Sequence, residues 1–113
     1  MPRLDDQDRL RHMLEAAEKV QRFVRGKTRR SLDEDEILYS ALTWLFQVIG
    51  EAARHVTKEF QAQHPEFEWD DIANFRHRIV HGYDMIDKDI MWNIIQYDVP
   101  VLVSNLQKAR RES

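Results

Sequence analysis

The sequence predicts an all-α fold, an antiparallel-type bundle of four to five helices, and three observations support it. Apolar residues recur at spacings of three and four along several long stretches, which is the period of an amphipathic helix. Carboxylate and hydroxyl side chains stand at the starts of these stretches, where helix N-caps occur. No stretch shows the sustained alternation of a convincing strand.

The composition is that of a globular protein with one core, since 42% of the 113 residues are hydrophobic and 33% are charged. We expect one domain over residues 1–113, with an ordered core from about 5 to 107. The absence of cysteine excludes disulfides and thiolate chemistry. The first ten residues are too charged for a signal peptide and no apolar run is long enough to cross a membrane, so the expected compartment is the cytoplasm. A net charge of −3 argues against broad nonspecific nucleic-acid binding but leaves a local basic patch open.

The first predicted helix covers residues 5–25. Aspartates crowd its start, where acids are favoured by the helix dipole, and Gly26 ends it. Its apolar stripe consists of Leu10, Met13, Leu14, Ala17, Val20 and Val24. The segment that follows is rich in cations, namely Arg25, Lys27, Arg29 and Arg30. These cations either contact RNA phosphates or form a solvated connector between two helices.

The second predicted helix covers residues 32–61 and begins at a capping box formed by Ser31 and Glu34. Its apolar residues fill an arc of about 200°, whereas one packed face needs only about 100°. We therefore expect burial on two sides, one of them against a second copy of the chain in a homodimer. Gly50 lies inside this helix, where glycine costs about 1 kcal/mol relative to alanine, and a close helix contact would explain it.

Glu51 and His55 lie one turn apart on the margin of this arc. Two interpretations are open. The pair supports an active site on a neighbouring helix, or it is a surface ion pair.

A short connector leads into the stretch on which the prediction of function depends. Pro65 ends the preceding pattern, and Asp70 or Asp71 can cap a short helix that Gly82 would end. The last two turns of this helix and the residues just past its end form the segment Phe75-Arg76-His77-Arg78-Ile79-Val80-His81-Gly82-Tyr83-Asp84. Arg76 and His81 lie about 140° apart on an ideal helix, so they converge if the helix ends near His81.

The last predicted helix begins at Asp87, which can cap it. Its apolar stripe consists of Ile90, Ile94, Tyr97 and Val101. Pro100 interrupts this pattern and should kink or split the helix. Residues from 108 onward are polar, and we expect them to fray.

The residue types limit the chemistry of the motif. His77 and His81 have the spacing of two helical metal ligands, but Arg78 lies between them and no third ligand is evident, so no metal or other cofactor is expected. The sequence contains neither a nucleophile elbow nor a glycine-rich phosphate loop. Cleavage of RNA by its own 2′-hydroxyl fits better, because it needs only a base such as histidine and a cation such as arginine.

The motif Arg76-x4-His81-x-Tyr83 resembles the signature of HepT-like toxins in the HEPN superfamily. The resemblance extends over residues 8–107 in segments of the same order and spacing. It includes His12-Met13-Leu14-Glu15-Ala16, Val48-Ile49-Gly50-Glu51-Ala52-Ala53, Pro65 followed by Trp69, and Asp98-Val99-Pro100-Val101-Leu102. Two positions differ from the commonest pattern, namely the segment before Arg76 and Asp84 after Tyr83.

The resemblance implies an all-helical homodimer and a metal-independent endoribonuclease with Arg76 and His81 as the catalytic pair. Its RNA substrate, with tRNA as one candidate, would lie in a cleft at the subunit interface. His77 and Glu51 are expected to support the site. The basic residues of the 25–30 segment and Arg78 are the candidate RNA contacts.

The resemblance also implies a partner, a small MntA-like nucleotidyltransferase antitoxin of a type VII toxin–antitoxin system. Such a partner can silence the toxin by attaching AMP to the motif tyrosine, here Tyr83. An alternative is a catalytically silent helical subunit of the same fold that binds a nucleotidyltransferase or a nucleotide. Growth arrest on expression of the chain alone distinguishes the two.

Overall fold

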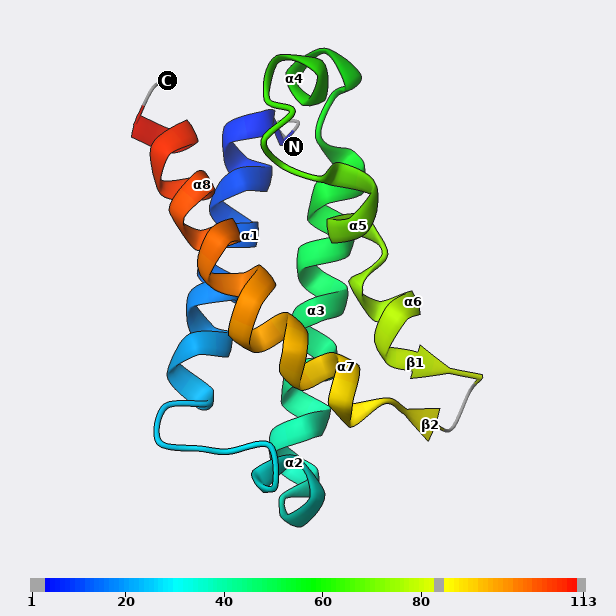
Figure 1. Cartoon of the computed structure of the whole chain (residues 1–113). Coiled ribbons are helices and arrows are strands. Elements are labelled where there is room, and N and C mark those ends of the chain that lie inside the picture. The colour runs from blue at the N-terminus through cyan, green and yellow to red at the C-terminus, as the bar shows by residue number, and fades with distance from the viewer. Residues whose placement is uncertain (1–3, 83–84, 112–113) are drawn as a thin grey trace.

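The computed structural model of the chain describes residues 4–82 and 85–111 and confirms the all-α helical fold. Three long helices lie side by side, α1 (Asp6–Phe23), α3 (Glu36–His55) and α8 (Val99–Arg111), as Figure 1 shows. Shorter helices, α5 (Trp69–Ala73) and α6 (Phe75–Ile79), lie along α3. Within the described residues, no helix combines the length and apolarity needed to span a membrane.

Helix α1 begins at a complete capping box. The backbone N–H of Asp8 donates to the Asp5 carboxylate at 2.9 Å, and the backbone N–H of Asp5 donates to the Asp8 carboxylate at 3.0 Å. The hydrogen bond from the Asp5 backbone is the main cause that lowers the pKa of Asp8. Gly26 follows the helix with φ +76°, so the predicted boundaries agree with the structure to within about two residues.

The predicted second helix is wrong as one continuous element. It consists of α2 (Ser31–Glu34), α3 and α4 (Lys58–Gln63). Asp35 is extended and its carboxylate accepts from the Leu38 backbone N–H at 3.0 Å, while the Thr57 hydroxyl accepts from the Phe60 N–H at 3.2 Å. These side chains satisfy the first amides of a new helix and so favour a break over continuation.

The expected capping box at Ser31 and Glu34 is also wrong. The Ser31 hydroxyl accepts from the backbone N–H of Thr28 at 3.0 Å, and the N-cap of α2 is Arg30, which makes no side-chain cap bond. The serine therefore stabilises the turn before the helix.

The apolar face of α3 is divided between core and solvent. Its inner side is fully buried at Leu42, Phe46 and Ile49, and the helix packs against α1, α5 and α6. Ile37 and Trp44, which lie within the predicted apolar arc, are 83% and 62% exposed. The chain by itself thus covers most of the predicted arc with α1, α5 and α6 and leaves the part around Ile37 and Trp44 open to solvent.

The motif helix is shorter than predicted and a small hairpin follows it. The helical path breaks at Asn74, and Val80 is already extended (φ −101°, ψ 117°). Strands β1 (Val80–His81) and β2 (Met85–Ile86) pair antiparallel, with His81 opposite Met85. Gly82 adopts the left-handed φ of +72° that was expected, but in the hairpin and not at a helix end. The expectation of no strand is therefore wrong for these four residues.

The last predicted helix has three parts, α7 (Lys88–Asn93), the π-helical segment η1 (Ile94–Asp98) and α8. Asp87 caps α7 as predicted, since its carboxylate accepts from the Ile90 N–H at 3.0 Å. Pro100 has no N–H to donate to a carbonyl of the preceding turn. Just before it the chain forms the wider π-helical turn η1, and the helix then continues as α8. Helix α8 continues to Arg111, past the expected end of the ordered core.

The π-helical turn also corrects the predicted apolar stripe. A π-helical turn holds an extra residue, so every later side chain rotates relative to the predicted pattern. Tyr97 and Val101, expected inside, are 72% and 59% exposed, whereas Val99, which was not in the predicted pattern, is buried.

Candidate active site

A cleft of about 530 Å³ lies between α3 and the α5–α6 segment, and we call it the motif cleft. Its lining consists of Phe46, Gln47, Gly50, Glu51, Arg54, Ala73, Asn74, Arg76 and His77. It therefore joins the segment around Gly50, which the resemblance singled out, to the first half of the sequence motif.

The absence of a side chain at Gly50 lets α5 approach α3 at this cleft. A Cβ atom at Gly50 would lie 2.8 Å from the backbone oxygen of Ala73, which is closer than such atoms approach one another. The close helix contact predicted from the glycine is confirmed. The carbonyl of Ala73 ends α5 one residue before the break at Asn74, so this contact sets where α6 begins.

Glu51 lines the motif cleft, but its partner differs from the predicted one. Its carboxylate pairs with Arg54 at 2.5 Å, and the other guanidinium nitrogen of Arg54 donates to the Ala73 carbonyl at 2.6 Å. His55 instead places its Nδ1 2.8 Å from the backbone oxygen of Glu51. Arg54, which the sequence analysis did not select, thus connects the cleft carboxylate to the end of α5. The i,i+3 spacing of Glu51 and Arg54 was the sequence feature from which this ion pair could have been predicted.

Arg76 and His77 enter the cleft from the first turn of α6. Phe75 anchors that turn, since it is buried and packs edge-on against Phe46 at a centroid distance of 5.7 Å. Among the residues that the structure describes, Arg76 has no ion-pair partner, and its side chain is exposed. Its guanidinium is therefore available to an external anion such as a phosphate.

His81 does not line the motif cleft. It lies on β1, two residues past the end of α6, with a side chain that is 53% exposed. Its Nε2 lies 3.7 Å from a carboxylate oxygen of Asp87. Tyr83, the expected modification site, lies outside the described residues. The structure thus brings Arg76, His77 and Glu51 to one cleft and places His81 on the adjoining hairpin.

The candidate RNA contacts are largely engaged within the chain. Arg29 pairs with Asp89 at 2.7 Å and Asp33 at 3.1 Å, and Arg30 pairs with Glu34 at 2.7 Å. The hydrogen bond to Asp89 is the main cause that raises the pKa of Arg29, and the bond from Arg29 lowers the pKa of Asp33.

The other three candidate RNA contacts differ in whether they form an ion pair within the chain. Arg78 pairs with Asp98 at 3.1 Å. Arg25 and Lys27 are exposed and form no ion pair with other described residues. These contacts favour the connector interpretation for Arg29 and Arg30 and leave Arg25 and Lys27 as the cations of that segment most open to RNA.

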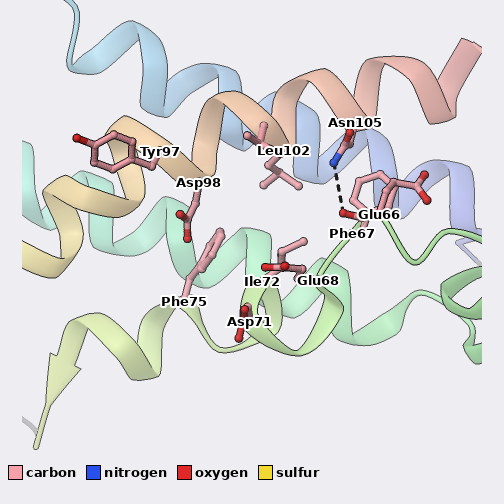
Figure 2. Close-up of a pocket in the computed structure, with 11 residues that line it drawn as sticks. Glu66, Phe67, Glu68, Asp71, Ile72, Phe75, Tyr97, Asp98, Leu102 and Asn105 are labelled. Atoms are coloured by element: carbon pink, nitrogen blue, oxygen red, sulfur yellow. Dashed lines mark hydrogen bonds between the residues drawn. The ribbon is translucent and has the colours of Figure 1, made fainter.

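A second hollow lies on the other side of α5, between α5 and α8, and Figure 2 shows its lining. Its volume is about 220 Å³, and four of its lining residues are acidic, namely Glu66, Glu68, Asp71 and Asp98. We call it the acidic groove. Because like charges repel, the acidic groove is unsuited to RNA, and the motif cleft is the better candidate.

Metal-ligand side chains are dispersed over the described part of the chain. Within residues 4–82 and 85–111, no three His, Asp or Glu side chains form a group that could hold a metal ion. His77 and His81, the pair with helical ligand spacing, lie on different elements, α6 and β1.

The fold and the sequence motif together define a class, a predominantly helical domain in which the Arg76 of an Arg-x4-His-x-Tyr sequence lines a cleft. The chain belongs to the ribonuclease HepT-like family, whose model matches residues 13–109. It is 28% identical to a probable ribonuclease HepT of Thermococcus cleftensis, over 92% of this chain and 94% of the relative. It is also 28% identical to a candidate RNase of Caldanaerobacter subterraneus subsp. tengcongensis, over 88% of each chain. No solved structure matches significantly.

Proposed function

We propose that this protein is a metal-independent endoribonuclease and the toxin of a type VII toxin–antitoxin pair. The observation that carries the proposal is the exposed guanidinium of Arg76, which lines the motif cleft and has no ion-pair partner among the described residues, in a chain from a ribonuclease family. The cation would bind the scissile phosphate, and the planar fork of arginine suits two phosphate oxygens at once.

The chemistry uses the RNA as its own nucleophile. The 2′-oxygen attacks the adjacent phosphorus while its proton passes to His81. The bond from phosphorus to the 5′-oxygen breaks, and that oxygen takes up a proton. The products are a 2′,3′-cyclic phosphate end and a 5′-hydroxyl end. Arg76 stabilises the charge that gathers on the phosphate oxygens during the attack.

Cleavage of a structured RNA such as tRNA should persist in excess EDTA, because histidine and arginine supply the base and the cation. The measurement is gel analysis of labelled RNA incubated with the purified protein, with and without EDTA. Arg76→Ala protein, prepared identically, is the control for contaminating nucleases. Loss of cleavage on chelation, restored by a divalent cation, would contradict the metal-free mechanism.

The exposed stripe on α3 supports a homodimer. Ile37 and Trp44 are exposed, and Ala41 and Val48 between and beyond them are half-buried. Trp44 also lines a shallow groove together with Gln47 and Glu51, both of which line the motif cleft. A second copy seated on this stripe would therefore adjoin the cleft, which agrees with a substrate site at the subunit interface.

Trp44→Asp should convert the dimer to a monomer, because it places a charge where an apolar ring would be buried. Light scattering at micromolar concentration measures the change. Tyr97→Asp, which alters an even more exposed aromatic residue outside α3, should remain dimeric. A wild-type protein that is monomeric at this concentration would contradict the proposal.

The partner is proposed to be a small nucleotidyltransferase that attaches AMP to Tyr83. Tyr83 follows His81 by two residues, so a phosphodiester on its hydroxyl would bring negative charge close to the proposed base. That charge would repel RNA and could pair with Arg76 in place of the substrate.

Co-expression with a small MntA-like nucleotidyltransferase should add one or more AMP units, measured by intact mass. The gain should vanish in Tyr83→Phe and persist in Tyr97→Phe, which removes an exposed tyrosine elsewhere. A toxin that is neutralised but unmodified would show that the partner inhibits by binding alone.

The alternative, a silent subunit that binds a nucleotidyltransferase or a nucleotide, is favoured by two observations. His81 lies outside the motif cleft, and three of the five candidate RNA cations are paired within the chain. Expression of the chain alone decides between the two, since only a toxin arrests growth.

A further inference from the structure

Asp87 lies where β2 leads into α7, and backbone contacts on both sides fix its position. Its N–H donates to the carbonyl of Ile79, the last residue of α6, at 2.6 Å. One oxygen of its carboxylate, Oδ1, accepts from the N–H of Ile90 at 3.0 Å and caps α7. The backbone and half of the carboxylate are thereby held by two helices.

The other carboxylate oxygen of Asp87 faces the proposed base. The hairpin reverses the chain, with His81 opposite Met85, and brings Asp87 back beside the imidazole. His81 Nε2 and Asp87 Oδ2 are 3.7 Å apart, which is within ion-pair range. The side chains are 53% and 34% exposed, so water and substrate can still reach the imidazole.

We propose that Asp87 is a positioning residue for His81 in the ribonuclease reaction. A carboxylate only accepts hydrogen bonds, so its contact favours a ring proton on Nε2 and leaves Nδ1 unprotonated toward the RNA. Nδ1 then takes the proton of the 2′-hydroxyl, and the carboxylate stabilises the imidazolium that results. Because α7 holds Asp87, the orientation of the base is tied to the helical frame. The inference rests on the proposed function.

Asp87→Asn separates this role from the capping role. Asparagine caps helices as well as aspartate does, so α7 should remain intact, while the charge facing His81 is lost. A buried carboxylate behind a catalytic histidine contributes ~10⁴-fold to kcat. Because this carboxylate is partly exposed and not yet at hydrogen-bond distance, we expect kcat to fall by about 10- to 100-fold, with KM and the unfolding midpoint nearly unchanged.

The matched control is Asp35→Asn. Asp35 caps α3 through the N–H of Leu38 at 3.0 Å, the same distance as in the cap that Asp87 makes, but has no histidine beside it. This variant should keep wild-type kcat and KM. An equal loss of kcat in both variants would overturn the proposal, because the loss would then follow from capping alone.

A double-mutant cycle tests whether Asp87 acts through His81. In a His81→Gln background, adding Asp87→Asn should cause no further loss of the residual single-turnover rate. If the two losses multiply, Asp87 acts independently of His81 and the inference is wrong.

A readout that needs no activity distinguishes failure of the inference from failure of the proposed function. Long-range ¹H–¹⁵N NMR of the His81 ring should show the Nε2–H tautomer as the main neutral form in wild type and a changed balance in Asp87→Asn. An unchanged spectrum refutes the role of Asp87. A changed spectrum in a protein that cleaves no RNA refutes the ribonuclease proposal alone.

Discussion

His81→Ala is expected to lower the rate of RNA cleavage by about 10²- to 10⁴-fold, the usual contribution of a positioned acid–base group. The fold should survive, because the side chain is half exposed and β1 is held by backbone pairing. Single-turnover cleavage of labelled RNA measures the rate, and thermal unfolding checks the fold. A rate within about threefold of wild type, a loss far smaller than that range, would remove His81 from the mechanism.

Arg76→Ala should cause a loss of similar size, and Arg76→Lys should restore only part of it, because an ammonium lacks the planar fork. Arg78→Ala is the matched control, since its guanidinium is already paired with Asp98. His77→Ala is informative for another reason, because His77 lines the motif cleft and His81 does not. If His77→Ala abolishes cleavage and His81→Ala does not, the base is His77.

Gly50→Ala should lower the free energy of unfolding by about 1–2 kcal/mol, although alanine favours helices by about 1 kcal/mol over glycine. The added Cβ would meet the Ala73 backbone oxygen at 2.8 Å, and a backbone atom cannot rotate away as a side chain can. Helix α5 must therefore shift, and with it the start of α6 that carries Arg76. RNA cleavage should fall together with stability.

Chemical denaturation followed by circular dichroism measures the effect of Gly50→Ala. Ser40→Ala, an exposed position in the same helix, is the control and should change stability by less than about 0.5 kcal/mol. The direction in which Gly50→Ala changes the free energy of unfolding decides the question. An increase in stability, which helix propensity alone predicts, would contradict the tight contact between α3 and α5.

Local signals predicted much of the fold correctly. Asp87 was identified as a cap, Gly26 as the end of α1, and Gly50 as a point of close approach, because each depends on the chemistry of one residue and its neighbours. Pro100 was also placed correctly as a disruption. Arg76 was selected from its spacing to His81, and His77 through the family resemblance, and both line one cleft.

Features that depend on competition between local and distant contacts were missed. Asp35 and Thr57 each divide the predicted second helix, since their side chains can cap a new helix as well as lie within a long one. Beside the hairpin, the N–H of Asp87 donates to the carbonyl of Ile79, a contact that sequence spacing does not reveal. The outward rotation of Tyr97 follows from a π-helical turn that the apolar pattern does not specify. The contacts of Arg54 with Ala73 were missed for the same reason.

The most direct test of the proposed mechanism is the chemistry of the ends that cleavage leaves. Fragments of a defined RNA cut by the purified protein are analysed by mass spectrometry. Attack by the 2′-hydroxyl predicts 2′,3′-cyclic phosphate and 5′-hydroxyl ends, and a single 2′-deoxy substitution at the cut site should stop cleavage there. Fragments with 3′-hydroxyl and 5′-phosphate ends, or cleavage that tolerates the deoxy substitution, would contradict the assignment of Arg76 and His81 to this reaction.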